Sequence, residues 1–91
     1  MIGANVRVGR DELDLIVRRG RAVRIVEVKE KTGDRYGHPL EMIDARKVEC
    51  VRRAGRRWLA AHPELARLDV RYEAVGVAPT GITRIPLSLD G

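Results

Sequence analysis

A β-hairpin is the feature that most limits the folds open to this chain. Residues 11–17 read D-E-L-D-L-I-V and begin with the polar-apolar alternation expected of a strand. Residues 22–29 read A-V-R-I-V-E-V-K and are rich in the β-branched residues that strands favour. The short segment between them contains Gly20, a residue type that tight turns favour. The two segments are therefore predicted to be antiparallel neighbours in a sheet.

The remaining segments predict a mixed β-sheet with one main helix. Residues 5–8 form a further short strand candidate, and residues 68–77 and 82–89 predict two more strands joined by a turn around Gly81. From about residue 40 to residue 62 the apolar residues recur at helical spacing, and a proline follows. The predicted fold class is α/β with the order β-β-β-α-β-β, in which the helix over residues 40–62 crosses between strands of the sheet.

The length of the chain predicts a single domain over residues 1–91, near the lower limit for burying a self-sufficient core. No apolar run reaches the about eighteen residues of a membrane span, and the N-terminus lacks the pattern of a signal peptide. We therefore expect a cytoplasmic protein without a membrane partner. Cys50 is the only cysteine, which excludes an internal disulfide and a cysteine-based zinc site.

The charge balance is compatible with a nucleic-acid partner. The chain has 18 Lys and Arg against 13 Asp and Glu, and 15 of those cations are arginine. The planar guanidinium of arginine suits phosphate oxygens. A GC-rich genome produces the same composition, so charge alone leaves the partner open. With no Phe, one Trp and two Tyr, the chain has few side chains for stacking on bases.

Hairpin geometry gathers acidic residues on one face of the sheet. With Arg19 and Gly20 as a two-residue turn, Glu12 pairs with Glu27, and Asp14 is a diagonal neighbour of Glu27. Paired residues share a face, so one face is predicted to carry Glu12, Asp14, Glu27 and Lys29. The other, core-like face is predicted to carry Leu13, Leu15, Val17, Val26 and Val28.

Carboxylates on adjacent strands repel one another, so a compensating cation is expected. Mg²⁺ and Mn²⁺ prefer oxygen ligands and would supply that charge. The alternative is a solvated sheet face with cross-strand ion pairs, such as Glu27 with Arg10.

Two lysines are placed to act with these acids. Lys29 lies two residues from Glu27 on the same face, where it can orient or deprotonate an attacking water or stabilise developing negative charge. Lys47 lies within the apolar stripe of the predicted helix, so it must either extend past its neighbours to solvent or meet buried carboxylates. The second alternative requires the helix and the acidic residues to share one face of the sheet.

The order of these residues resembles a known family. Asp14 followed by Glu27-Val28-Lys29 is similar to the D…(D/E)-x-K signature of the restriction-endonuclease-like nuclease superfamily. A longer series resembles the YraN-like family, whose uncharacterised members are similar to archaeal Holliday-junction resolvases. That series comprises Asn5-Val6-Arg7, Glu12-Leu13-Asp14-Leu15-Ile16, Val26-Glu27-Val28-Lys29, Arg35-Tyr36-Gly37-x-Pro39-x-Glu41, Lys47 and Arg67-Leu68-Asp69-Val70. The resemblance covers nearly the whole chain and implies a restriction-endonuclease-like mixed sheet.

The resemblance implies a metal-dependent endonuclease acting on DNA, including branched or junction DNA. Asp14 and Glu27 become Mg²⁺ or Mn²⁺ ligands, Lys29 the catalytic lysine and Lys47 a supporting one. Glu12 and the Val28 carbonyl become further metal ligands. The rival prediction is a nucleic-acid-binding or scaffold protein with a degenerate nuclease fold and no turnover.

The predicted phosphate contacts flank the acidic residues. Arg7, Arg10 and Arg35 lie in the hairpin and the following loop, where they can meet a nucleic-acid backbone. Tyr36 and Gly37 either let that loop approach the backbone closely or simply form a tight turn.

The chain departs from the YraN-like pattern at its N-terminus. Members of that family usually begin with a helix that carries a glutamate near the metal site, whereas this chain begins at the following strand. We expect a misplaced start, a truncation, or self-association as a homodimer that covers the exposed sheet face.

Overall fold

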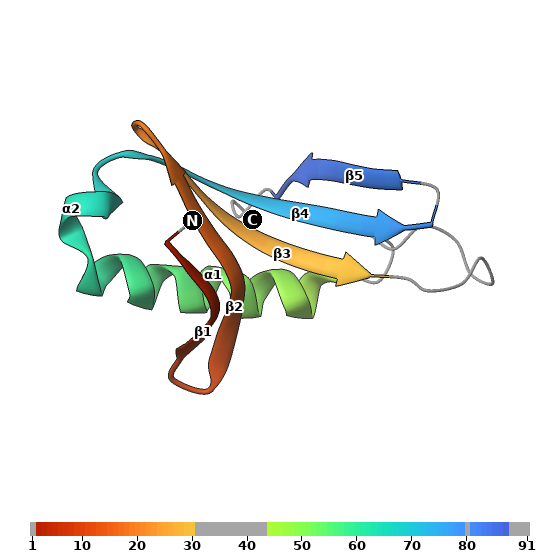
Figure 1. Cartoon of the computed structure of the whole chain (residues 1–91). Coiled ribbons are helices and arrows are strands. Elements are labelled where there is room, and N and C mark those ends of the chain that lie inside the picture. Colours follow the sequence, from red (N-terminus) through yellow and green to blue (C-terminus); the bar gives the residue numbers. More distant parts are fainter. Residues whose placement is uncertain (1, 31–43, 80, 88–91) are drawn as a thin grey trace.

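A five-stranded mixed sheet with one long helix along its side forms the protein, as the computed structural model in Figure 1 shows. The structure describes residues 2–30, 44–79 and 81–87. The elements are β1 (Gly3–Val8), β2 (Asp11–Arg19), β3 (Ala22–Glu30), α1 (Ala45–Ala61), α2 (Pro63–Ala66), β4 (Asp69–Ala78) and β5 (Gly81–Pro86). This arrangement confirms the predicted α/β fold and its order β-β-β-α-β-β. No helix in the described ranges has both the length and the apolar composition needed to cross a membrane.

The ends of the helices differ from the prediction. Helix α1 begins at Ala45 because Asp44 caps it, its side chain accepting a hydrogen bond from the Lys47 backbone N–H at 3.0 Å. The predicted start near residue 40 lies outside the described residues. The sequence did not predict α2, which follows directly with Pro63 at its first position. Proline is tolerated there because a first-turn N–H has no partner within the helix.

The strands follow the order β1-β2-β3-β4-β5 across the sheet. β3 and β4 are parallel, with Ala22 opposite Asp69 and Glu30 opposite Val77, and the other neighbours are antiparallel. Parallel neighbours need a crossover connection, and α1 and α2 lie within it. The central strand of the sheet is therefore β3.

The predicted register of the β2–β3 hairpin is wrong by two residues. Leu15 pairs with Val26 and Arg19 with Ala22, so Gly20 and Arg21 form the turn. Gly20 has φ +62°, a left-handed conformation that glycine adopts without steric cost. A shift of two residues keeps the side chains of the paired residues, 15–19 and 22–26, on their predicted faces. The regular pairing extends to Leu15 and Val26, one residue short of Asp14 and Glu27.

The core lies on the sheet face opposite to the predicted one. Helix α1 packs on the face that carries Ile16, Val23 and Ile25, which are all fully buried. On the predicted core face Val26 is buried, but Leu15 and Val17 are only half-buried. Among the described residues, the buried members of this core cluster are Leu13, Ile16, Val23, Ile25, Val51, Ala54, Trp58 and Leu65. Since Glu27 shares the face of Ile25, the helix covers the same face as this glutamate.

A glycine lets α1 approach the sheet closely. Gly55 is buried in the middle of α1, where glycine costs about 1 kcal/mol relative to alanine. The ring of Tyr72 in β4 lies directly against it, so a Cβ at position 55 would come within 2.6 Å of Cε2 of that ring. The absence of a side chain thus sets the distance between helix and sheet.

Replacing this glycine should destabilise the fold although alanine is the better helix former. We expect Gly55→Ala to displace the Tyr72 ring and lower the free energy of unfolding by about 1–3 kcal/mol, measured by thermal and urea melts. Arg56→Ala, at the exposed neighbouring position, serves as the control and should leave the melting temperature nearly unchanged. A rise in Tm for Gly55→Ala, as helix propensity alone predicts, would contradict this packing.

Candidate functional site

Glu27 is the one polar or charged residue that is buried within the described ranges, with 2 % of its surface exposed. It lies in the central strand β3, on the face covered by α1. Burying a carboxylate is costly unless its oxygens are compensated. Its Oε2 atom nevertheless has no hydrogen-bond partner among the described residues. An unsatisfied atom of this kind in a protein interior needs an explanation.

Asp14 reaches Glu27 from a local irregularity in β2. The buried residues Leu13 and Ile16 are three positions apart, so the alternation of side chains along β2 shifts by one residue between them. At this point the Oδ2 atom of Asp14 accepts a hydrogen bond from the backbone N–H of Val28 at 2.8 Å. This bond ties the Asp14 side chain to β3 next to Glu27. Irregularities of this kind often re-aim a side chain beside an active site.

The environment raises the pKa of Glu27 above its ordinary value. Burial is the largest cause because it disfavours the charged form, and the negative charge of Asp14 is the next. The positive charge of Lys47 acts in the opposite direction. Without a cation at the site, Glu27 therefore holds its proton to a higher pH than a solvated glutamate.

Two lysines face the other oxygen of Glu27. The Nζ atom of Lys47, from α1, lies 3.4 Å from Oε1, and the Nζ atom of Lys29, from β3, lies 3.8 Å from the same oxygen. Both ammonium groups stay partly exposed to solvent. The predicted meeting of Lys47 with a buried carboxylate is confirmed, as is the proximity of Lys29 to Glu27. We call Asp14, Glu27, Lys29 and Lys47 the Glu27 cluster.

Glu12 is not brought into the Glu27 cluster. Asp11 binds α1 through Arg53, and Leu13 is buried in the core, so both point toward the helix. Strand alternation then directs Glu12 to the opposite side of β2, where it is exposed. The sequence could not show this, because the shift in alternation at Asp14 depends on a hydrogen bond between strands.

The predicted phosphate contacts are only partly described. Arg7 in β1 and Arg10 in the β1–β2 turn are both exposed, and neither forms an ion pair with a residue that the structure describes. Arg35, Tyr36 and Gly37 lie outside the described residues.

A bidentate ion pair between β2 and α1 was missed by the sequence prediction. Arg53 donates from Nε and Nη2 to Asp11 at 2.8 and 2.9 Å. The Arg53 guanidinium holds the pKa of the Asp11 carboxyl below its usual value, chiefly through this hydrogen bonding. The pair fixes α1 against β2 and thereby helps to position Lys47 above Glu27.

The ligand types at the Glu27 cluster suit a hard divalent cation. Asp14 and Glu27 offer carboxylate oxygens, and Oε2 of Glu27 is unsatisfied. Mg²⁺ and Mn²⁺ prefer oxygen ligands and are commonly bound through one or two carboxylates with several waters. No group of three His, Cys, Asp or Glu side chains suited to a metal occurs in the part of the chain that the structure describes. A cation here would therefore also use backbone carbonyl groups, water or a substrate oxygen.

Comparison with known proteins places relatives in several bacteria. Residues 1–77 match the model of a family described as uncharacterised protein family UPF0102. The UPF0102 protein Francci3_3586 of Frankia casuarinae is 38% identical over 87 residues, which cover 93% of this chain and 73% of the relative. A UPF0102 protein of Methylorubrum extorquens is 50% identical over 68 residues, covering 75% of this chain and 52% of the relative. The matches thus span from about half to three quarters of these relatives' lengths.

Proposed function

This chain belongs to the uncharacterised protein family UPF0102, as the YraN-like series of residues predicted, and we propose that it is a Mg²⁺- or Mn²⁺-dependent nuclease that hydrolyses phosphodiester bonds of DNA. The description of the family assigns no activity, so the proposal depends on the Glu27 cluster. Similarity of Asp14 and Glu27-Val28-Lys29 to the signature of restriction-endonuclease-like nucleases supports it further.

The observation that carries the proposal is the buried Glu27, whose Oε2 has no hydrogen-bond partner among the described residues. A small domain gains nothing in stability from a carboxylate that is buried beside a second carboxylate. Perturbed carboxyl groups of this kind are common at sites where a ligand supplies the missing charge. The two lysines on Oε1 leave Oε2 as the oxygen that lacks compensation.

Each residue of the Glu27 cluster has its own role in the proposed reaction. Asp14, Glu27 and the Val28 carbonyl would hold the divalent cation, which when bound supplies positive charge to a phosphate and acidifies a water. The Lys29 ammonium donates hydrogen bonds to phosphate oxygens and stabilises the negative charge that develops there. Lys47 keeps Glu27 ionised and oriented through their ion pair. Glu12 is left out of this ligand set because it points to the other side of β2.

A cleavage assay tests the proposal. Purified chain is incubated with labelled four-way-junction, linear duplex and single-stranded DNA, in Mn²⁺ or in EDTA. We expect Mn²⁺-dependent cleavage of at least one substrate by the wild type and by Glu30→Gln, whose exposed carboxylate follows the cluster in β3. Glu27→Gln should not cleave. If the wild type cuts no substrate that Glu27→Gln leaves intact, the nuclease proposal is wrong, and binding without cutting would indicate a nucleic-acid-binding protein without turnover.

A further inference from the structure

A basic pocket lies at the end of the β2–β3 hairpin remote from the Glu27 cluster. It has a volume of about 530 Å³ and lies between the hairpin turn and the connection from α2 to β4. The residues that line it are Arg18, Arg21, Glu64, Arg67 and Leu68. Three arginines and one glutamate thus line the same pocket. We call this site the hairpin-tip pocket.

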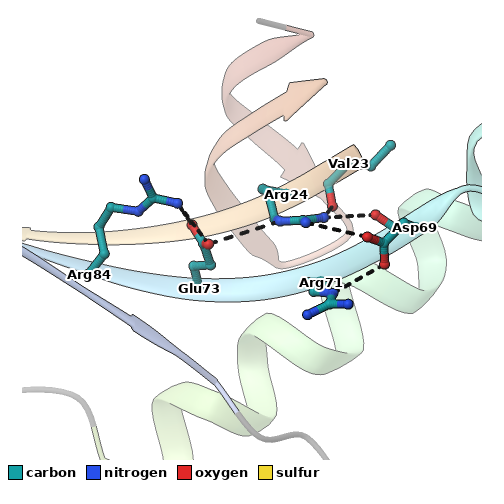
Figure 2. A network of polar contacts seen from close by, with 6 residues as sticks. All are labelled: Val23, Arg24, Asp69, Arg71, Glu73 and Arg84. Carbon is teal, nitrogen blue, oxygen red and sulfur yellow. Dashed lines mark hydrogen bonds and ion pairs between the residues drawn. The ribbon is translucent and has the colours of Figure 1, made fainter. Parts of the chain in front are cut away.

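The arginines of this pocket lack the carboxylate partners that five arginines elsewhere in the described ranges have. On the opposite face of the sheet, Figure 2 shows Arg24, Arg71 and Arg84 in a network with Asp69 and Glu73. On α1, arginines 52 and 53 are each bound by an acidic residue.

By contrast, none of Arg18, Arg21 and Arg67 forms an ion pair within the described ranges. Arg18 donates only to the backbone carbonyl of Gly20, at 2.9 Å. Glu64 also forms no ion pair among the described residues. Guanidinium groups gathered without enough opposite charge repel one another, and this repulsion is relieved by an anion that binds between them.

The pocket and the Glu27 cluster lie along the same face of the hairpin. Arg18 pairs with Val23, whose side chain is buried on the α1 face, so Arg18 leaves the sheet on the face of Glu27. Val23 and Glu27 are four residues apart in β3, a distance of roughly 13 Å along a strand. Helix α1 covers the residues between them, Val23 and Ile25, which are fully buried. The pocket and the cluster are therefore separate sites on this face.

We propose that the hairpin-tip pocket binds a backbone phosphate of DNA at a site separate from the Glu27 cluster. Guanidinium groups suit this role because each can donate two parallel hydrogen bonds to phosphate oxygens. The contact reads no sequence, since it touches only the backbone. That the DNA bound here is also the substrate of the Glu27 cluster rests on the proposed nuclease function, whereas phosphate binding by the pocket does not.

The test measures binding in EDTA, so that neither a divalent cation nor cleavage takes part. Fluorescence anisotropy of labelled duplex and four-way-junction DNA is recorded at several salt concentrations for the whole chain. Arg21→Ala with Arg67→Ala removes two pocket charges. Arg71→Ala with Arg84→Ala removes the same charge from the opposite face and is the matched control. Arg18→Ala provides a second pocket variant, and circular dichroism confirms the fold of each protein.

We expect the pocket double variant to raise Kd by roughly tenfold and to reduce the slope of log K against log salt by about 2, because two phosphate contacts are lost. Arg18→Ala should reduce that slope by about 1. The control double variant should retain the wild-type slope. Equal losses in both double variants, an unchanged slope in the pocket variants, or no DNA binding by the wild type would each overturn the proposal. A chain that binds through the pocket but never cleaves would refute only the nuclease function.

Discussion

Lys29→Met should lower the rate of Mn²⁺-dependent DNA cleavage by at least about a hundredfold, the usual effect of removing one donor that stabilises transition-state charge. Methionine keeps the length and apolar stem of lysine and removes only the ammonium. Since Lys29 lies 3.8 Å from Glu27 and is partly exposed, its loss leaves the buried carboxylates in place. The measurement is a single-turnover cleavage rate, combined with the Mn²⁺-induced rise in Tm, which should persist.

Lys47→Met is the matched comparison, because it removes the other ammonium beside the same oxygen. If Lys47 only positions Glu27, its loss should slow cleavage less, and raising the pH should recover part of the rate as Glu27 ionises. A Lys29→Met protein that cleaves at the wild-type rate would remove Lys29 from the mechanism. Equal losses in the two variants would show that positive charge near Glu27 matters and that the position of Lys29 does not.

Glu27→Gln should stabilise the protein in the absence of divalent cations and abolish its response to them. The amide can donate to Asp14, whereas the ionised carboxylate leaves Oε2 unsatisfied beside a second negative charge. Removing one buried unsatisfied group usually raises the free energy of unfolding by about 1–3 kcal/mol. Each kcal/mol raises the Tm of a domain this small by about 4–8 °C. Mn²⁺ should raise the Tm of the wild type but leave that of Glu27→Gln unchanged, because only the wild type binds the cation.

The same variant should change the pH dependence of stability. The folded pKa of Glu27 is raised above its ordinary 4.5, so between the two values the native state binds more protons than the unfolded chain. Wild-type stability in EDTA therefore falls as the pH rises through this window. The advantage of Glu27→Gln should be small below about pH 4 and greatest above the folded pKa. Thermal melts of both proteins in EDTA across this pH range test the prediction, with Glu30→Gln as the control. If Glu27→Gln is less stable than the wild type at neutral pH, the prediction is wrong.

Local sequence patterns predicted the strands of the fold, since the alternation in residues 11–17 and the β-branched content of residues 22–29 determine their conformation locally. The register was wrong because Gly20 can occupy either position of a two-residue turn, and only pairing between strands selects one. The core face was wrong because Ile16, Val23 and Ile25 form an equally apolar stripe on the other side of the same hairpin.

At the site, Lys47 was predicted correctly because a charge within an apolar stripe needs a partner wherever the helix packs. Glu12 was wrongly predicted to share the face of Glu27, because the prediction assumed regular alternation along the strand. The shift between Leu13 and Ile16 interrupts that alternation. Arg53 was missed because its partner Asp11 is distant in the sequence. The periodicity of one segment does not predict features that depend on contacts with distant segments.

The parallel pairing of β3 with β4 also bears on the order in which the protein folds. Asp14 and Glu27 belong to one hairpin, a local structure that forms within microseconds. Lys47 comes with α1, inside the crossover that must close before β4 can join β3, and closing a long loop carries an entropic cost that slows folding. The two carboxylates are therefore brought together on the nascent hairpin before their cationic partner from the helix arrives. Under the proposed function, a divalent ion bound at this stage would compensate the two carboxylates and so assist folding as well as catalysis.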